Sequence, residues 1–134
     1  LVPGMWVTSQ SQLEQKQKNQ HALIGALKKI PNQTQIFSYC SAVSLVAKSG
    51  RLTTQEATST WWMAAYLKEQ YPNTQWRFSR TLVVGQTNIT ASGVNGYLPI
   101  GLALIKKHCG EKVLREVTKI MVLPRPETQQ HPFQ

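Results

Sequence analysis

The chain has 134 residues and a mass of 15.1 kDa, the size of one domain, and its 41% hydrophobic residues are enough for a buried core. Lys and Arg total 15 against 6 acidic residues, which gives a formal net charge of +9. All six acids are glutamates, so the sequence excludes a Ser-His-Asp triad, an aspartic protease dyad, an EF-hand and the aspartate ligands of magnesium. The basic residues are dispersed, which favours a solvated basic surface over a nucleic-acid site.

The first half of the chain predicts two helices with one strand between them. A helix begins at the capping residues near Ser9 and runs to about Ile30. Residues 35–39 predict a short apolar strand, and residues 43–50 predict a short helix that ends at a glycine. The strand therefore passes through a sharp turn at Cys40 directly into a helix.

The second half predicts further helices and strands in alternation. Residues 56–71 predict a helix. Three short strands follow, at residues 76–78, 81–84 and 88–90. Two more helices are expected on either side of Gly110, at residues 94–108 and 111–122, the second with its apolar side chains turned inward. This order predicts an α/β domain with a largely parallel sheet. The strands are too few for a complete doubly wound sheet, so we expect that strands upstream of this sequence are missing.

Cys40 carries the sharpest chemical signal. A cysteine between a buried strand and a helix N-terminus sits on a tight elbow, where helix N–H groups and the helix dipole lower the thiol pKa and favour the thiolate. The N–H of Ser41 would then face a bound anion. The alternative is an inert cysteine that packs as a small hydrophobic side chain, and the spacing leaves both open. Cys109 lies far away, and neither cysteine belongs to a CxxC or zinc pattern.

A catalytic cysteine also needs a base, and the sequence offers His21, His108 and His131. None follows the elbow at the expected distance, so we expect each to be structural or solvated. We also predict no metal site and no cofactor.

Two further features suit a pocket. Thr90-Ala91-Ser92-Gly93 joins a strand to a helix through small residues, which form either a pocket wall at the carboxyl edge of the sheet or an ordinary cap at Ser92. Trp61 and Trp62 are adjacent on a predicted helix and so face different directions, one into the core and the other toward a pocket or a dimer interface.

Residues 39–43, 45–52 and 57–61, in that order and spacing, resemble the class I glutamine amidotransferase-like superfamily. The nearest branch is the sensor domain of AraC-type transcriptional regulators, which is related to intracellular proteases of the Pfp type. The resemblance extends to Val2-Pro3-Gly4, to residues 90–94 with 102–104, and to Arg125 and the Gln-x-Pro-Phe of residues 130–133.

The resemblance implies a flavodoxin-like three-layer sandwich with the elbow at the centre of a mostly parallel sheet. It also implies that this chain lacks the first strands of the domain and the C-terminal helix-turn-helix pair that binds DNA. The catalytic-type histidine of the family aligns with Thr60, the elbow glycine with Ala42 and the second glycine of Pro-Gly-Gly with Met5. Without that histidine, nucleophilic hydrolysis is not expected.

We therefore predict that residues 1–134 form a partial amidotransferase-like sensor domain of an AraC-type regulator, which dimerises and binds an unidentified small-molecule effector. The predicted pocket residues are Gly4, Cys40, Ser41, Thr60, Trp61 and Gly93. DNA would be bound through the absent domain. With no signal peptide and no apolar run as long as a membrane span, we expect a cytoplasmic protein. The alternatives are a cysteine-dependent hydrolase or amidase-like enzyme of the same superfamily and, from charge alone, a nucleic-acid-binding module.

Overall fold

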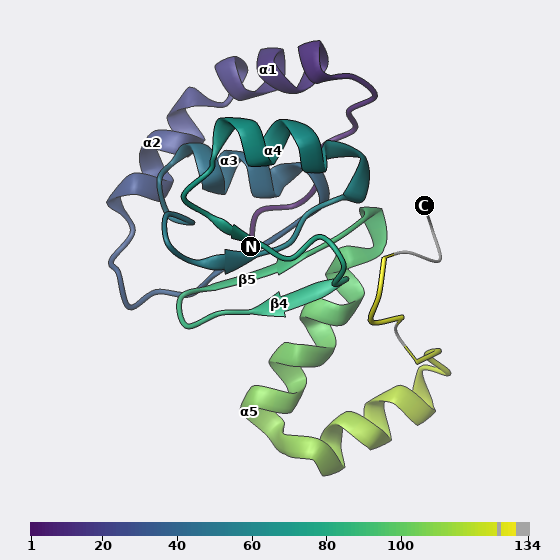
Figure 1. Ribbon diagram of the computed structural model, residues 1–134. Coiled ribbons are helices and arrows are strands. Elements are labelled where there is room, and N and C mark those ends of the chain that lie inside the picture. The colour runs from purple at the N-terminus through teal and green to yellow at the C-terminus, as the bar shows by residue number, and fades with distance from the viewer. Residues whose placement is uncertain (126, 131–134) are drawn as a thin grey trace.

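Helices lie on both faces of a small central sheet (Figure 1). The computed structural model describes residues 1–125 and 127–130. The sheet has the order β1-β5-β4, formed by β1 (Ile36–Tyr39), β4 (Leu82–Val84) and β5 (Asn88–Ala91). β5 pairs in parallel with β1 and antiparallel with β4. A parallel bridge from Val2 to Ser38 extends the other edge of β1. A second parallel pair joins β2 (Glu56–Ala57) and β3 (Gln75–Trp76).

The helices divide between two layers. α2 (His21–Lys29), α3 (Val43–Lys48) and α4 (Ala64–Gln70) cover one face with α1 (Gln10–Asn19) outside them, and α5 (Tyr97–Ile120) covers the other (Figure 1). Three 3-10 turns, η1 (Cys40–Ala42), η2 (Trp61–Met63) and η3 (Val94–Gly96), precede α3, α4 and α5. The three layers confirm the predicted α/β class.

The predicted N-terminal helix is two helices. Ser9 caps α1 as expected, because its hydroxyl accepts the N–H of Gln12 at 3.2 Å. The helix then breaks at Gln20, whose N–H is shared between the carbonyls of Lys16 and Gln17.

The predicted helix at residues 56–71 is wrong over its first half. Residues 58–60 are buried and extended between β2 and η2. The Thr58 N–H donates to the hydroxyl of Thr90 at 2.8 Å, and the Thr58 hydroxyl donates to the Arg80 carbonyl at 2.7 Å. These long-range hydrogen bonds hold an extended backbone, and a run of Thr-Ser-Thr has little helix propensity to oppose them.

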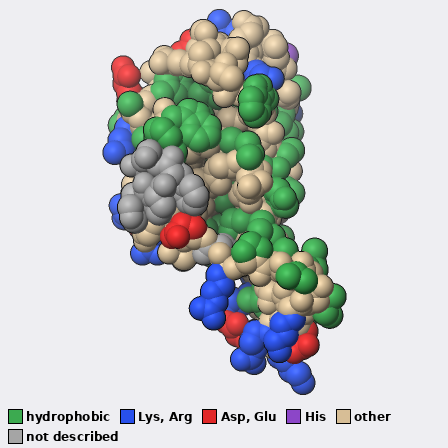
Figure 2. Space-filling view, turned by 90° about the vertical axis from the view of Figure 1, so that its right-hand side faces the viewer, with side chains coloured by type: hydrophobic (Ala, Val, Ile, Leu, Met, Phe, Trp, Pro, Cys, Tyr) green, Lys and Arg blue, Asp and Glu red, His purple; other side chains and the backbone are tan. Residues whose placement is uncertain are grey.

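The break predicted at Gly110 is confirmed, because its backbone (φ 84°, ψ 172°) is not helical. The inward packing predicted beyond it is wrong. Ile120 is 79% exposed and Met121 62% exposed, since the part of α5 beyond the kink lies apart from the sheet and projects from the body (Figure 1). Lys and Arg side chains gather around this projecting end (Figure 2). No helix in the part of the chain described here is long and apolar enough to cross a membrane.

Candidate functional site

Cys40 occupies a strained elbow between β1 and η1. Its φ is 57°, in the left-handed region that β-carbon-bearing residues rarely adopt. The strand must reverse into the η1–α3 turn within one residue, and this φ provides the reversal. The sequence prediction of a tight elbow is therefore confirmed in its geometry.

The N-terminal segment locks the elbow in place. Gly4 passes so close that a β-carbon there would lie 2.9 Å from Cβ of Cys40 and 3.3 Å from the ring of Tyr39, closer than packed atoms tolerate. The Ser41 hydroxyl donates to the Met5 carbonyl at 2.6 Å and accepts the Met5 N–H at 2.8 Å. A main-chain approach this close requires the glycine, so Gly4 and Ser41 serve to hold the elbow.

The environment of the thiol does not activate it. Cys40 is buried, and this burial raises the pKa of its thiol because a thiolate loses its hydration there. Hydrogen bonds from the backbone and side chain of Ser41 lower the pKa, but by less than burial raises it. Of the two alternatives left open by the sequence, this direction favours the inert, packed cysteine over a thiolate stabilised by the helix N-terminus.

No base among the described histidines serves the elbow. His21 stands on the exposed side of α2, with Nδ1 3.3 Å from the Lys18 carbonyl, and His108 is exposed on α5. His131 lies outside the described residues. Thr60 is fully buried, and its hydroxyl has no hydrogen-bond partner in the part of the structure described. Residues 1–125 and 127–130 contain no group of three side chains suited to hold a metal ion.

A cavity of about 380 Å³ opens beside the elbow rather than at it. Trp61 and Gly93 line it, as predicted for a pocket, whereas Gly4, Cys40, Ser41 and Thr60 are not among its described lining residues. The other lining residues come from η2, from the residue just before β4, from the segment that leads into α5 with its first turn, and from the returning C-terminal segment: Trp62, Thr81, Ser92, Val94, Asn95, Leu98, Pro99, Glu127 and Gln130.

The C-terminal wall of this cavity escaped the sequence analysis. Gln130 is buried, and its side-chain Nε2 donates to Thr58 Oγ1 at 3.0 Å, to the Ser59 carbonyl at 2.9 Å and to the Arg80 carbonyl at 2.8 Å. The Ser59 hydroxyl donates in turn to the Cys40 carbonyl at 2.8 Å, so one set of bonds joins the cavity wall to the elbow. No local spacing brings residue 130 beside residue 80. The only sign was the resemblance of residues 130–133 to a segment that closes the family's domain.

No family model matches the chain, and no curated protein matches it. Solved structures, however, share its arrangement. A putative transcriptional regulator from Vibrio parahaemolyticus matches with a TM-score of 0.69 at 19% identity, over 83% of this chain and 58% of that one. A ThiJ/PfpI family protein from Pseudomonas syringae matches with a TM-score of 0.66 at 20% identity, over 84% and 45%. The chain has the ThiJ/PfpI fold.

This ThiJ/PfpI fold agrees with the predicted class I glutamine amidotransferase-like architecture. An AraC family transcriptional regulator from Pseudomonas putida shares it as well, with a TM-score of 0.60 at 16% identity over 86% of this chain and 57% of that one. DJ-1 proteins of several organisms are similar too. The chain therefore spans about half the length of the solved structures that it matches.

Proposed function

We propose that the chain is a ligand-sensing domain of an AraC-type transcriptional regulator that binds a small molecule without transforming it. The observation that carries this proposal is the elbow itself. Cys40 keeps the strained backbone of a nucleophile elbow, but burial raises the pKa of its thiol, and Thr60 stands where the family's histidine is expected. Two matching solved structures are named as transcriptional regulators, which supports this choice.

The six predicted pocket residues enter the proposal in two groups. Trp61 and Gly93 contact the effector, since both line the cavity. Gly4, Cys40, Ser41 and Thr60 form the packed elbow that supports this wall. A cytoplasmic location, homodimerisation, and DNA binding through a further domain belong to the same proposal. They rest on the resemblance to AraC-type regulators.

One feature favours the competing function, a cysteine-dependent hydrolase or amidase. The positive φ of Cys40 and the neighbouring Ser41 N–H reproduce the geometry that such enzymes use to expose a nucleophile and stabilise an oxyanion. Thiol reactivity separates the two functions, because a hydrolase needs a thiolate at neutral pH.

The chain contains its own reference thiol for this test. Cys109 is exposed on α5, whereas Cys40 is buried. We expect iodoacetamide at pH 7.5 to alkylate Cys40 more slowly than Cys109, because burial raises the pKa of the Cys40 thiol and so lowers its thiolate fraction, and also shields the sulfur from the reagent. Peptide mass spectrometry measures both rates in one sample, and Cys40→Ser confirms the assignment. Faster alkylation of Cys40, with a rate already level below pH 7, would contradict the sensor and support the enzyme.

A further inference from the structure

The cavity beside the elbow has walls that suit an apolar molecule. Trp61 and Trp62 stand edge to face, with ring centroids 5.8 Å apart, and both remain partly open to solvent at 38% and 52% exposure. Val94 in η3 and Leu98 and Pro99 in the first turn of α5 add further apolar lining. Removing the exposed parts of these two indole rings from water would be energetically favourable, so this apolar surface can contribute to the binding of a ligand. The volume of about 380 Å³ lies within the range of small-molecule sites.

The electrostatics of the cavity are opposite to those of the protein. Lys and Arg outnumber Glu by 15 to 6 in the chain, yet none of the described lining residues is Lys or Arg. Glu127 is the one ionisable side chain among them. A single carboxylate and no Lys or Arg favour a positively charged ligand, and the indole rings add to this preference because the face of an aromatic ring attracts cations.

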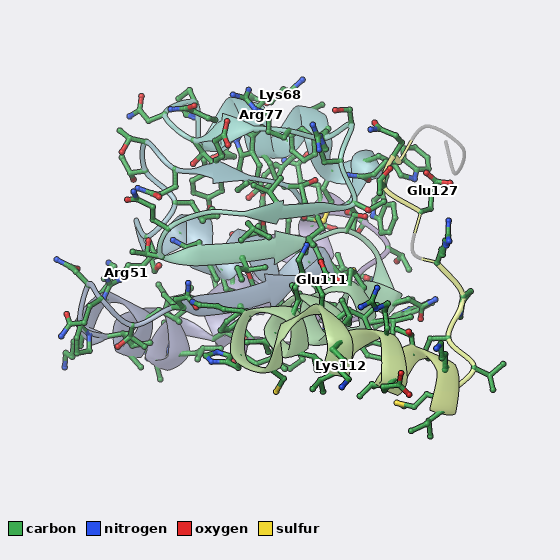
Figure 3. All side chains as sticks on the ribbon, turned by 90° about the horizontal axis from the view of Figure 1, so that it is seen from below. Arg51, Lys68, Arg77, Glu111, Lys112 and Glu127 are labelled. Atoms are coloured by element: carbon green, nitrogen blue, oxygen red, sulfur yellow. The ribbon has the colours of Figure 1, made fainter. Side chains whose placement is uncertain are left out.

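Glu127 is held where it lines the cavity. Its carboxylate Oε1 accepts the N–H groups of Thr128 at 2.9 Å and Gln129 at 3.1 Å, and its carbonyl accepts the hydroxyl of Thr81 at 2.5 Å. The side chain stands on the segment that returns past the sheet, well away from Arg51 at the far side of the molecule (Figure 3). In the described part of the chain its carboxylate forms no ion pair, so one charge remains for a ligand.

We propose that this cavity binds an apolar amine, whose ammonium group pairs with Glu127 while its aromatic or branched hydrocarbon body lies against Trp61 and Trp62. The inference rests on the proposed sensing function and adds the chemical class of the effector. It also gives the C-terminal segment a role. Because residues 127–130 form one wall and are tied to Ser79 and Arg80 on the body, a bound amine links this segment to the rest of the domain.

Three compounds that share one phenyl ring and a two-carbon framework isolate the charge. Phenethylamine carries a cation, 2-phenylethanol is neutral and phenylacetate is an anion. In calorimetric titrations of the full chain, we expect phenethylamine to bind about fivefold more tightly than 2-phenylethanol, the factor expected for one partly exposed ion pair, and phenylacetate to bind most weakly. Competition with salt should reduce the preference for the amine.

Glu127→Gln tests the assigned partner, because a glutamine oxygen can still accept the two backbone N–H groups and so preserve the segment. The variant should bind the amine and the alcohol equally and keep the affinity of the wild type for the alcohol. Glu116→Gln on the projecting end of α5 is the matched control and should change neither affinity.

Equal binding of amine and alcohol by the wild type would overturn the inference, as would an amine preference that survives Glu127→Gln. Tighter binding of phenylacetate would refute the amine class while leaving a sensor in place. If none of the three compounds binds, the cavity assignment is wrong. The sensing function is then judged separately by the alkylation of Cys40, which does not depend on this cavity.

Discussion

Gln130 should anchor the C-terminal segment, and its replacement by alanine provides a measurable test. Its amide Nε2 shares two N–H groups among three acceptors inside the protein, and one such hydrogen bond has a net stabilisation of about 0.5–1.5 kcal/mol. The Arg80 carbonyl keeps a second donor in the variant, the Thr58 hydroxyl at 2.7 Å, so the loss falls mainly on the Ser59 carbonyl and on the space that the amide leaves. We expect Gln130→Ala to lower the free energy of unfolding by about 2 kcal/mol.

Urea unfolding followed by tryptophan fluorescence measures this change, and Gln129→Ala is the matched control because no side-chain hydrogen bond of Gln129 is found in the described structure. Hydrogen exchange adds a local readout. The Thr81 N–H donates to the Thr128 carbonyl at 3.1 Å, so Gln130→Ala should speed its exchange. If the two alanine variants unfold within about 0.5 kcal/mol of each other and Thr81 keeps its protection, the anchoring role is refuted.

Two further outcomes follow from the packing around Gly4 and from the half-buried phenol of Tyr66. Gly4→Ala should destabilise the fold by about 1–3 kcal/mol, because its β-carbon would meet Cβ of Cys40 at 2.9 Å. The control is Gly25→Ala in α2, which has open space around it and should be neutral or stabilising by up to about 1 kcal/mol. Similar unfolding midpoints for the two variants would contradict the close approach. Burial, followed by the charges of Tyr71 and Glu14, raises the pKa of Tyr66 to about 12. The folded state therefore holds this proton after the unfolded state has lost it, so stability should fall as the pH rises above 10, the ordinary pKa of tyrosine. Absorbance titration should lose its component near pH 12 in Tyr66→Phe, and an unchanged curve would show that Tyr66 titrates normally.

The elements that the sequence predicted well are those with local signals. A short apolar run marked β1, small residues marked the turn before α5, and Gly110 marked the kink. The elbow at Cys40 followed from a strand that runs without a spacer into a helix. Each of these features depends on residues close together in the chain, so local sequence patterns are enough to predict it.

The errors arose where distant residues decide the structure. Thr58 is extended because Thr90 and Arg80 bond to it, and neither is near in sequence. The thiol pKa of Cys40 rises because the N-terminal segment and neighbouring side chains bury it, an effect that overrides the helix terminus. The cavity also needs Glu127 and Gln130, which only tertiary packing brings beside Trp61. The sequence therefore located the elbow, and two of the six predicted pocket residues, Trp61 and Gly93, line the cavity.

Whether the domain binds a small molecule without transforming it is decided by the fate of a bound ligand. A panel of small molecules that includes phenethylamine is screened by thermal shift with the wild-type chain and with Cys40→Ser, and each stabilising compound is then recovered after prolonged incubation and analysed by mass spectrometry. We expect compounds that raise Tm equally in both proteins and are recovered unchanged. A compound that the wild type converts and Cys40→Ser does not would contradict it and show that Cys40 is a working nucleophile.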